Sequence, residues 1–272
     1  MIKAFVRRLT PWPIISFYHR LLAELAAVVY GHPSEKLIVI GVTGTNGKST
    51  TTSFIGQILE HAGHRVGWTS TATIKVADKE WPNDRKMTML GRFQLQKLLK
   101  EMVGAGCEYA IIETSSQGIV QHRHVGINYD VVVFTNLTPE HIESHGGFGN
   151  YKQAKLELFK HFSRRRHKVN PSLKDGLGLI PKVMVVNGGD PHAKDFLACE
   201  ADRKIAFEVD ENLQLTESGA SFMALGVEMD LPIPGRFNVE NALAAVSVAM
   251  ALDVPIPIIK DAVVHLRSVP GR

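Results

Sequence analysis

Cysteine is scarce in this chain of 272 residues, and neither sign of charge dominates it. The two cysteines, Cys107 and Cys199, lie far apart without CxxC spacing, which excludes a disulfide framework and a cysteine zinc site. The 31 basic and 27 acidic residues leave a formal charge of only +4, and without a binding motif this argues against a nucleic-acid partner. We therefore expect a protein of the reducing cytoplasm that does not bind nucleic acid.

A long uninterrupted apolar run is also missing. The most apolar early stretch, residues 13–30, is broken by His19, Arg20 and Glu24, so a membrane span of about 20 residues is not expected. Residues 1–35 instead predict an N-terminal helical segment with apolar and basic side chains. Such a helix is suited to packing on the body of the protein, which we favour, or to lying on an anionic membrane surface.

What is present is the composition of an ordinary globular protein, with 44% hydrophobic and 21% charged residues. From residue 36, short β-rich runs alternate with longer helical patterns, as in a parallel sheet covered by helices. Over residues 36–267 we therefore predict an α/β fold, a mostly parallel P-loop-type sheet flanked by helices, with a small β-rich subsidiary sheet near residues 213–229. The expected strands cover residues 37–42, 65–70, 109–112, 130–134 and 183–186, and the expected helices cover 49–61, 92–103, 151–162, 193–199, 238–252 and 258–266. The basic run at 164–168 predicts a solvated loop.

The segment GVTGTNGKST at residues 41–50 lies between a predicted strand and a predicted helix. A glycine-rich loop in that position presents backbone N–H groups to a polyphosphate at the positive end of the helix. Lys48 is then placed to bridge the β- and γ-phosphates, and the Ser49 hydroxyl to bind Mg²⁺. The strict motif requires glycine where Val42 stands, so this is the variant TGTNGKST. A simple glycine turn is the alternative, but the lysine and two hydroxyls favour phosphate binding.

Glu113 ends another predicted strand. An α/β sheet presents its ligands at the carboxyl edge of the strands, so this carboxylate is a candidate to hold Mg²⁺ together with Ser49. Capping of a helix is the alternative reading.

Five further sequence blocks follow the loop in order. They are ETSSQG at residues 113–118, FTNLTPEH at 134–141, YKQAK at 151–155, NGGD at 187–190 and GRFNVENA at 235–242. With the variant loop, these blocks resemble the Mur ligases, ATP-dependent enzymes that add amino acids to the UDP-N-acetylmuramoyl peptide of the bacterial cell-wall precursor. The stretch SSQG followed by VQHR is most similar to the ligase that adds the third residue. Folylpolyglutamate synthases share the loop and the chemistry and remain an alternative, as does a nucleotide-dependent binding module or switch.

The resemblance implies an ADP-forming ligase that uses ATP and Mg²⁺ and acts on a UDP-N-acetylmuramoyl peptide and an amino acid. The implied nucleotide-binding residues are Gly44, Thr45, Asn46, Gly47, Lys48, Ser49 and Thr50, with Asn238 and Asn241 near the adenine ring. The implied catalytic residues are Lys48, Glu113, His141 and Lys155, and the implied metal ligands are Ser49, Glu113, His141 and Lys155. The family's lysine at the position of Lys155 is carbamylated, which turns an ammonium into an anionic oxygen ligand. Helix capping is the alternative role for Asn238 and Asn241.

Five residues are candidates for binding the UDP-sugar peptide: Thr88, Ser115, Ser116, Gln121 and Arg123. Arg123 suits an anionic group on that substrate. For Asp190 the resemblance implies only proximity to the nucleotide, and a turn role is the alternative. Glu140 stands where the family has aspartate.

The end of the chain, residues 268–272, resembles the linker into the family's third domain. In the family that domain binds the incoming amino acid. We expect it to be absent from this chain, which is then either a fragment of a longer gene product or is completed by a domain from elsewhere. We therefore expect the chain alone to bind Mg·ATP without completing a ligation.

Overall fold

The computed structural model describes residues 11–85, 87–140, 145–169 and 178–269. An eight-stranded sheet runs through it in the order β4-β3-β2-β5-β1-β6-β7-β8. The strands are β1 Ile38–Thr43, β2 Val66–Thr69, β3 Thr73–Val76, β4 Lys79–Pro82, β5 Tyr109–Glu113, β6 Val131–Phe134, β7 Val183–Asn187 and β8 Arg203–Phe207. The pairs from β2 to β8 are parallel, whereas β3 and β4 add an antiparallel edge. The predicted mostly parallel sheet is thus confirmed.

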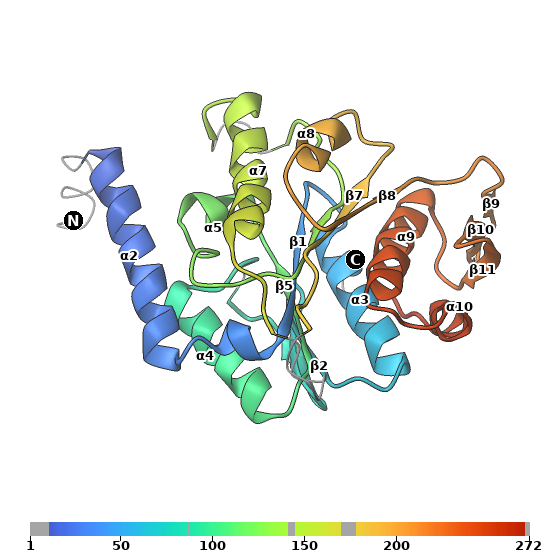
Figure 1. The fold of residues 1–272 in the computed structure, drawn as a ribbon. Coiled ribbons are helices and arrows are strands. Elements are labelled where there is room, and N and C mark those ends of the chain that lie inside the picture. The colour runs from blue at the N-terminus through green and yellow to red at the C-terminus, as the bar shows by residue number, and fades with distance from the viewer. Residues whose placement is uncertain (1–10, 86, 141–144, 170–177, 270–272) are drawn as a thin grey trace.

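Helices cover both faces of this sheet (Figure 1). The helices are α2 Trp12–Tyr30, α3 Lys48–His61, α4 Arg92–Gly104, α5 Ser116–Val120, α7 Phe148–Arg164, α8 Ala193–Leu197, α9 Arg236–Ala251 and α10 Ile256–Val264, with a 3₁₀ turn at Pro33–Lys36. Alternate residues of β1 enter opposite cores: Ile40 and Val42 pack with α3, α9 and α10, and Val39 packs with α4 and α7. This period of two is that of a strand buried on both faces.

The predicted subsidiary sheet is also confirmed. It consists of β9 Gln214–Leu215, β10 Ala220–Ala224 and β11 Val227–Leu231, all antiparallel. Phe222 and Met229 are buried in the same core as α9 and α10. The small sheet therefore extends the α9 side of the domain.

Four elements escaped the sequence analysis: β3, β4, α5 and β8. All four residues of β4 are exposed, so that strand has no alternation of apolar and polar side chains. The helix α5 has only five residues, too few for a helical period. The strand β8 lies at the edge of the sheet, with one of its five residues buried.

The solvated loop predicted at residues 164–168 is wrong for Lys168. This side chain is buried, and its Nζ donates to Asp130 Oδ2 at 2.5 Å and to the Leu37 carbonyl at 2.8 Å. Burial raises the pKa of Asp130, while the Lys168 ammonium opposes that shift. The ion pair between Lys168 and Asp130 thus holds the segment after α7 against the start of β1. Local sequence does not reveal this contact, because Asp130 comes close to Lys168 only in the folded chain.

The packing expected for the N-terminal helix is confirmed for one face of α2. Ala23, Ala26 and Ala27 are buried on that face, and α2 lies along α4. Farther toward its N-terminus, Ser16 Oγ and His122 Nε2 are 2.6 Å apart. Apolar side chains remain exposed on α2: Trp12, Ile14, Phe17, Tyr18, Leu21, Leu25, Val28 and Val29. Within the described residues, no helix is both long enough and apolar enough to cross a membrane.

Candidate active site

The glycine-rich loop connects the end of β1 to the start of α3 at the carboxyl edge of the sheet. Because β1 pairs with β5 on one side and β6 on the other, Glu113 and Phe134 end at the same edge. Two of the predicted blocks therefore flank the loop. The site lies where an α/β sheet generally binds its ligands.

Close packing explains why glycine stands at position 44. A Cβ atom on Gly44 would be 1.9 Å from Thr135 Oγ1, a distance that no side chain tolerates. Gly47 has a φ of +81°, the left-handed conformation that glycine adopts without strain. Both glycines are thus required by the loop's conformation and surroundings.

The segment after β6 holds the loop in place. Asn136 accepts a hydrogen bond from the Asn46 backbone N–H at its Oδ1 (2.9 Å), and the Thr135 hydroxyl donates to the Asn46 carbonyl (2.6 Å). Asn187 in turn donates to the Thr135 carbonyl, and Asp190 accepts from the Leu137 backbone N–H. Asp190 therefore supports the segment after β6, which in turn contacts the loop. The sequence did not single out Thr135, Asn136 and Asn187 as site residues, although they lie within the FTNLTPEH and NGGD blocks.

Ser49 and Glu113 meet in the buried floor of the site. The Ser49 hydroxyl donates to Glu113 Oε2 at 2.8 Å, and both residues are almost inaccessible to solvent. Glu113 also accepts from the backbone N–H of Thr71 (2.6 Å) and from its hydroxyl (3.0 Å). The Thr88 hydroxyl lies 3.0 Å from the Thr71 hydroxyl, which joins a predicted substrate residue to the predicted metal ligand. A hydroxyl and a carboxylate are oxygen donors of the kind that Mg²⁺ prefers, so this pair fits a magnesium site. Thr71 carried no sequence signal.

Lys48 and Lys155 bring two amino groups to the loop. Lys48 Nζ donates to the Thr45 carbonyl at 2.7 Å, and Lys155 Nζ donates to the Gly44 carbonyl at 2.5 Å. Lys155 is buried and lies over the Tyr151 ring, 4.5 Å from its centroid. Burial, with a smaller contribution from the Lys48 charge, holds the pKa of Lys155 well below its usual range. This amine is therefore easily deprotonated and can act as a nucleophile.

A cavity of about 990 Å³ lies on one side of the loop. Asn46 and Gly47 line it from the loop, and Asn238 and Asn241 line it from α9. Asn241 Oδ1 accepts from the Thr51 hydroxyl at 3.1 Å, and Asn238 donates to the Pro234 carbonyl at 2.7 Å. Neither asparagine is the N-cap of α9, which is Gly235.

A second cavity, of about 500 Å³, lies on the other side of the loop. It is lined by Gly44, Thr45, Lys48, Lys155 and Tyr151 together with Thr88, Ser115, Ser116, Arg123 and His145. Gln121 is not part of this lining; its Oε1 accepts from Arg123 Nε and Nη2, so it positions the guanidinium. Ser115 accepts from the Gly118 N–H and caps α5.

Thr50 and Glu140 also lie at the loop and its larger cavity. Thr50 lines the larger cavity, and Glu140 accepts a hydrogen bond from the Asn46 side chain at 2.9 Å. The predicted metal ligand His141 lies outside the described residues.

Comparison with curated proteins finds similar sequences over almost the whole chain. UDP-N-acetylmuramyl-tripeptide synthetase of Roseiflexus sp. (strain RS-1) is 34% identical over 266 residues, which cover 92% of this chain and 51% of that protein. UDP-N-acetylmuramoyl-L-alanyl-D-glutamate–2,6-diaminopimelate ligase 1 of Clostridium acetobutylicum is 35% identical over 257 residues, 93% of this chain and 50% of that protein. The chain thus spans about half the length of the curated relatives it matches.

Solved structures show the same architecture. A UDP-N-acetylmuramoyl-L-alanyl-D-glutamate–2,6-diaminopimelate ligase superposes with a TM-score of 0.72 at 29% identity, over 87% of this chain and 47% of that one. Folylpolyglutamate synthase of Mycobacterium tuberculosis, complexed with ADP and AMPPCP, superposes with a TM-score of 0.66 at 18% identity, over 92% of this chain and 62% of that one. The second likeness shows the fold alone. The family model of the Mur ligase middle domain matches residues 42–249, which include the phosphate loop and most of the sheet, and the chain therefore belongs to the Mur ligase family.

Proposed function

We propose that this chain is the nucleotide-binding part of an ATP-dependent ligase that extends a UDP-N-acetylmuramoyl peptide by one amino acid. One observation carries the proposal: the phosphate loop forms a wall shared by two cavities. Asn46 and Gly47 face the larger cavity, whereas Gly44, Thr45 and Lys48 face the smaller one. A nucleotide in the larger cavity would therefore present its terminal phosphate toward an acceptor in the smaller one.

The reaction has two steps, formation of an acyl phosphate and then of an amide bond. A carboxylate oxygen of the muramoyl peptide attacks the γ-phosphorus of ATP, the bond from that phosphorus to the β–γ bridging oxygen breaks, and ADP leaves. The amino group of the incoming amino acid then attacks the acyl carbon, loses a proton and displaces phosphate. Positioning and charge neutralisation supply most of the catalysis in such transfers.

The chain's own residues divide this work. Lys48 and the loop N–H groups bind the phosphates, and Ser49 and Glu113 hold Mg²⁺, which neutralises phosphate charge when bound. Arg123 in the smaller cavity binds an anionic group of the peptide substrate. Asn238 and Asn241 contact the adenine end of the nucleotide.

In the active ligase the Lys155 amine is carbamylated. Its buried amine, with its lowered pKa, is suited to add to CO₂ with loss of a proton. The product is an anion with two oxygen donors at the wall of the smaller cavity. His141 is the remaining metal ligand that the family resemblance implies.

The test has two parts, one for nucleotide binding by this chain and one for the whole activity, because the chain spans about half the length of its curated relatives. Calorimetry on residues 1–272 should show Mg²⁺-dependent ATP binding that Lys48→Ala abolishes, and mass spectrometry should find no extended peptide. Positional isotope exchange in ATP, measured with the complete polypeptide, should depend on a UDP-muramoyl dipeptide. Exchange with folate substrates alone would move the assignment to the polyglutamate synthases. A thermal midpoint that ATP shifts but the muramoyl dipeptide does not would favour a nucleotide switch.

A further inference from the structure

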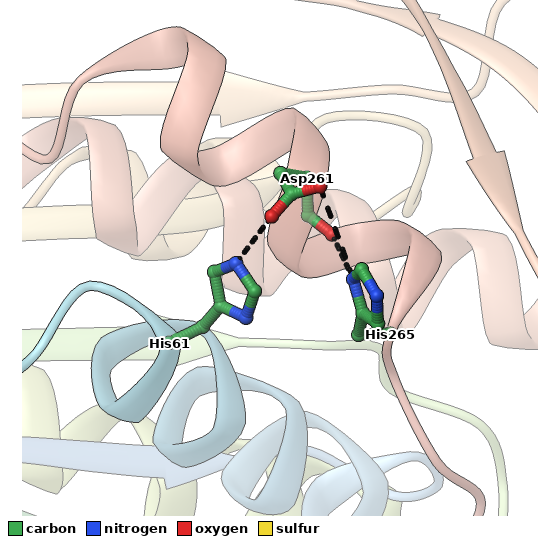
Figure 2. A group of neighbouring side chains, drawn as sticks. All are labelled: His61, Asp261 and His265. Carbon is green, nitrogen blue, oxygen red and sulfur yellow. Dashed lines mark hydrogen bonds and ion pairs between the residues drawn. The ribbon is translucent and has the colours of Figure 1, made fainter.

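A second group of metal-ligating side chains lies away from the phosphate loop. Figure 2 shows His61, at the end of α3, and His265, just after α10, on either side of Asp261. His61 Nε2 is 2.6 Å from Asp261 Oδ2, and His265 Nδ1 is 4.0 Å from Asp261 Oδ1. One ligand atom from each residue can be chosen so that all three lie within 4.8 Å of one another.

We propose that His61, Asp261 and His265 form a binding site for a divalent transition-metal ion of the Zn²⁺ class. Two imidazole nitrogens and one carboxylate oxygen are the donors that such ions select, whereas Mg²⁺ and Ca²⁺ prefer oxygen alone. Zinc bonds of about 2.0–2.2 Å place tetrahedral ligands roughly 3–3.5 Å apart, so small side-chain rotations bring these atoms into range.

The arrangement of the rings favours an ion over a simple ion pair. One carboxylate needs only one imidazole partner, yet the second ring stacks on the first with centroids 5.4 Å apart and planes 22° apart. An imidazole can offer one ring nitrogen lone pair to a metal, so the two neighbouring rings can supply two nitrogen ligands to one cation. His265 Nδ1 is 2.8 Å from the Asp261 backbone carbonyl, a contact that metal binding would replace.

The backbone that carries the three ligands is well fixed. Asp261 and His265 are four residues apart at the end of α10, the spacing that puts side chains on one helix face. Ile259 and Ala262 of α10 are buried in the same core as Ile58 and Leu59 of α3. Binding would therefore cost little conformational entropy of the backbone, because the two helices are already packed together.

The ligands are also reachable. The side chains of His61, Asp261 and His265 are 32%, 63% and 63% exposed, and a cavity of about 810 Å³ lies beside both histidines. An ion can thus enter from solvent. Beside the cluster, Gln57 exchanges two hydrogen bonds with the backbone of Arg267, which lines the larger cavity near the loop. A bound ion would therefore hold α10 and the segment after it against α3.

The test is a titration of the 272-residue chain with ZnCl₂ in excess Mg²⁺, followed by calorimetry and by the visible absorption of Co²⁺ as a substitute. The wild-type chain should bind one ion, show the absorption bands of Co²⁺ bound to nitrogen and oxygen, and gain several degrees in Tm. His61→Gln, Asp261→Asn and His265→Gln should each weaken binding about tenfold or more. Circular dichroism of each variant without metal verifies that it is folded.

The matched control is His64→Gln. His64 also follows α3 and lies 3.0 Å from a carboxylate, that of Glu108, but it belongs to no three-ligand group among the described residues. This variant should bind the ion like the wild type. The proposal is overturned if the wild type binds no more tightly than a His61→Gln/His265→Gln double variant, or if His64→Gln weakens binding as much as the cluster variants do.

Discussion

Gly47 lies against the Asn241 side chain, so closely that a Cβ atom on Gly47 would be 2.1 Å from Asn241 Oδ1. This contact joins the phosphate loop to α9, which comes almost two hundred residues later. The glycine therefore serves the loop in two ways: it adopts a positive φ, and it leaves room for the asparagine that lines the same cavity.

Gly47→Ala is expected to weaken Mg·ATP binding about tenfold or more and to destabilise the chain by about 1–2 kcal/mol, the cost of a left-handed alanine. Calorimetry and thermal unfolding measure the two effects. Gly104→Ala is the control, because nothing lies within 4 Å of a Cβ at this helical position. It should be neutral or stabilise by up to about 1 kcal/mol. Unchanged ATP affinity in Gly47→Ala would contradict the role of the loop.

Glu113→Gln keeps the size of the side chain but removes its charge. The Ser49 hydroxyl and the Thr71 backbone N–H can still donate to the amide oxygen, and the Thr71 hydroxyl can accept from the amide NH₂, so the fold should persist. ATP binding should become nearly independent of Mg²⁺, because the anionic oxygen of the proposed metal pair is lost. Calorimetry with and without Mg²⁺ checks this, and Glu101→Gln, whose exposed side chain lies on α4, serves as the control. Wild-type Mg²⁺ dependence in Glu113→Gln would remove Glu113 from the metal site.

Lys155→Ala, made in the complete polypeptide, should abolish most ligase activity and regain part of it when short carboxylates are added. These anions replace the oxygens of the proposed carbamate. In the unaltered chain, carbon NMR with labelled bicarbonate should show one carbamate signal that the substitution removes. Lys152→Ala, on the same helix but paired with Asp195 at 2.8 Å, should keep both activity and signal. Absence of the signal together with failure of the rescue would refute carbamylation.

Acid should destabilise the chain through His161. Burial lowers the pKa of this imidazole to about 4 from an ordinary 6.5; the Ile127 carbonyl opposes the shift, while Arg165 and Lys182 add to it. Between pH 6.5 and pH 4 the His161 imidazole is therefore protonated in the unfolded chain but not in the folded one. The free energy of unfolding should be highest above pH 6.5 and should fall as the pH drops toward 4. The loss amounts to at most about 3 kcal/mol.

Thermal unfolding followed against pH tests this expectation. His161→Gln should flatten the acid side of the profile, although buried His124, whose pKa is also depressed, keeps part of the slope. His167→Gln, an exposed histidine three residues beyond the end of α7, should leave most of the slope in place. A profile that His161→Gln leaves as steep as before would assign the acid sensitivity to other groups.

The central strands, and the site residues at their carboxyl ends, could be predicted from the sequence. Strands such as β5 and β6 are short runs of apolar residues, and parallel strands end at one edge, so Ser49 and Glu113 were predicted to meet. Thr71 and Asn136 were not predicted to belong to the site. Their contacts with Glu113 and with the phosphate loop arise only because the strand order places their segments beside the loop. Lys168 was wrongly assigned to solvent because its partner, Asp130, is near only in the folded chain.

The order of strands and helices also determines when this site can exist during synthesis. The strand β1 is made early, yet both of its neighbours, β5 and β6, emerge much later. The hydrogen bond from Thr51 to Asn241 joins residues 190 positions apart. A growing chain on the ribosome therefore carries an uncovered apolar face of α3 until α9 has left the exit tunnel. We therefore expect chains that end before α9 to expose this apolar face and to aggregate instead of forming a weaker nucleotide-binding domain.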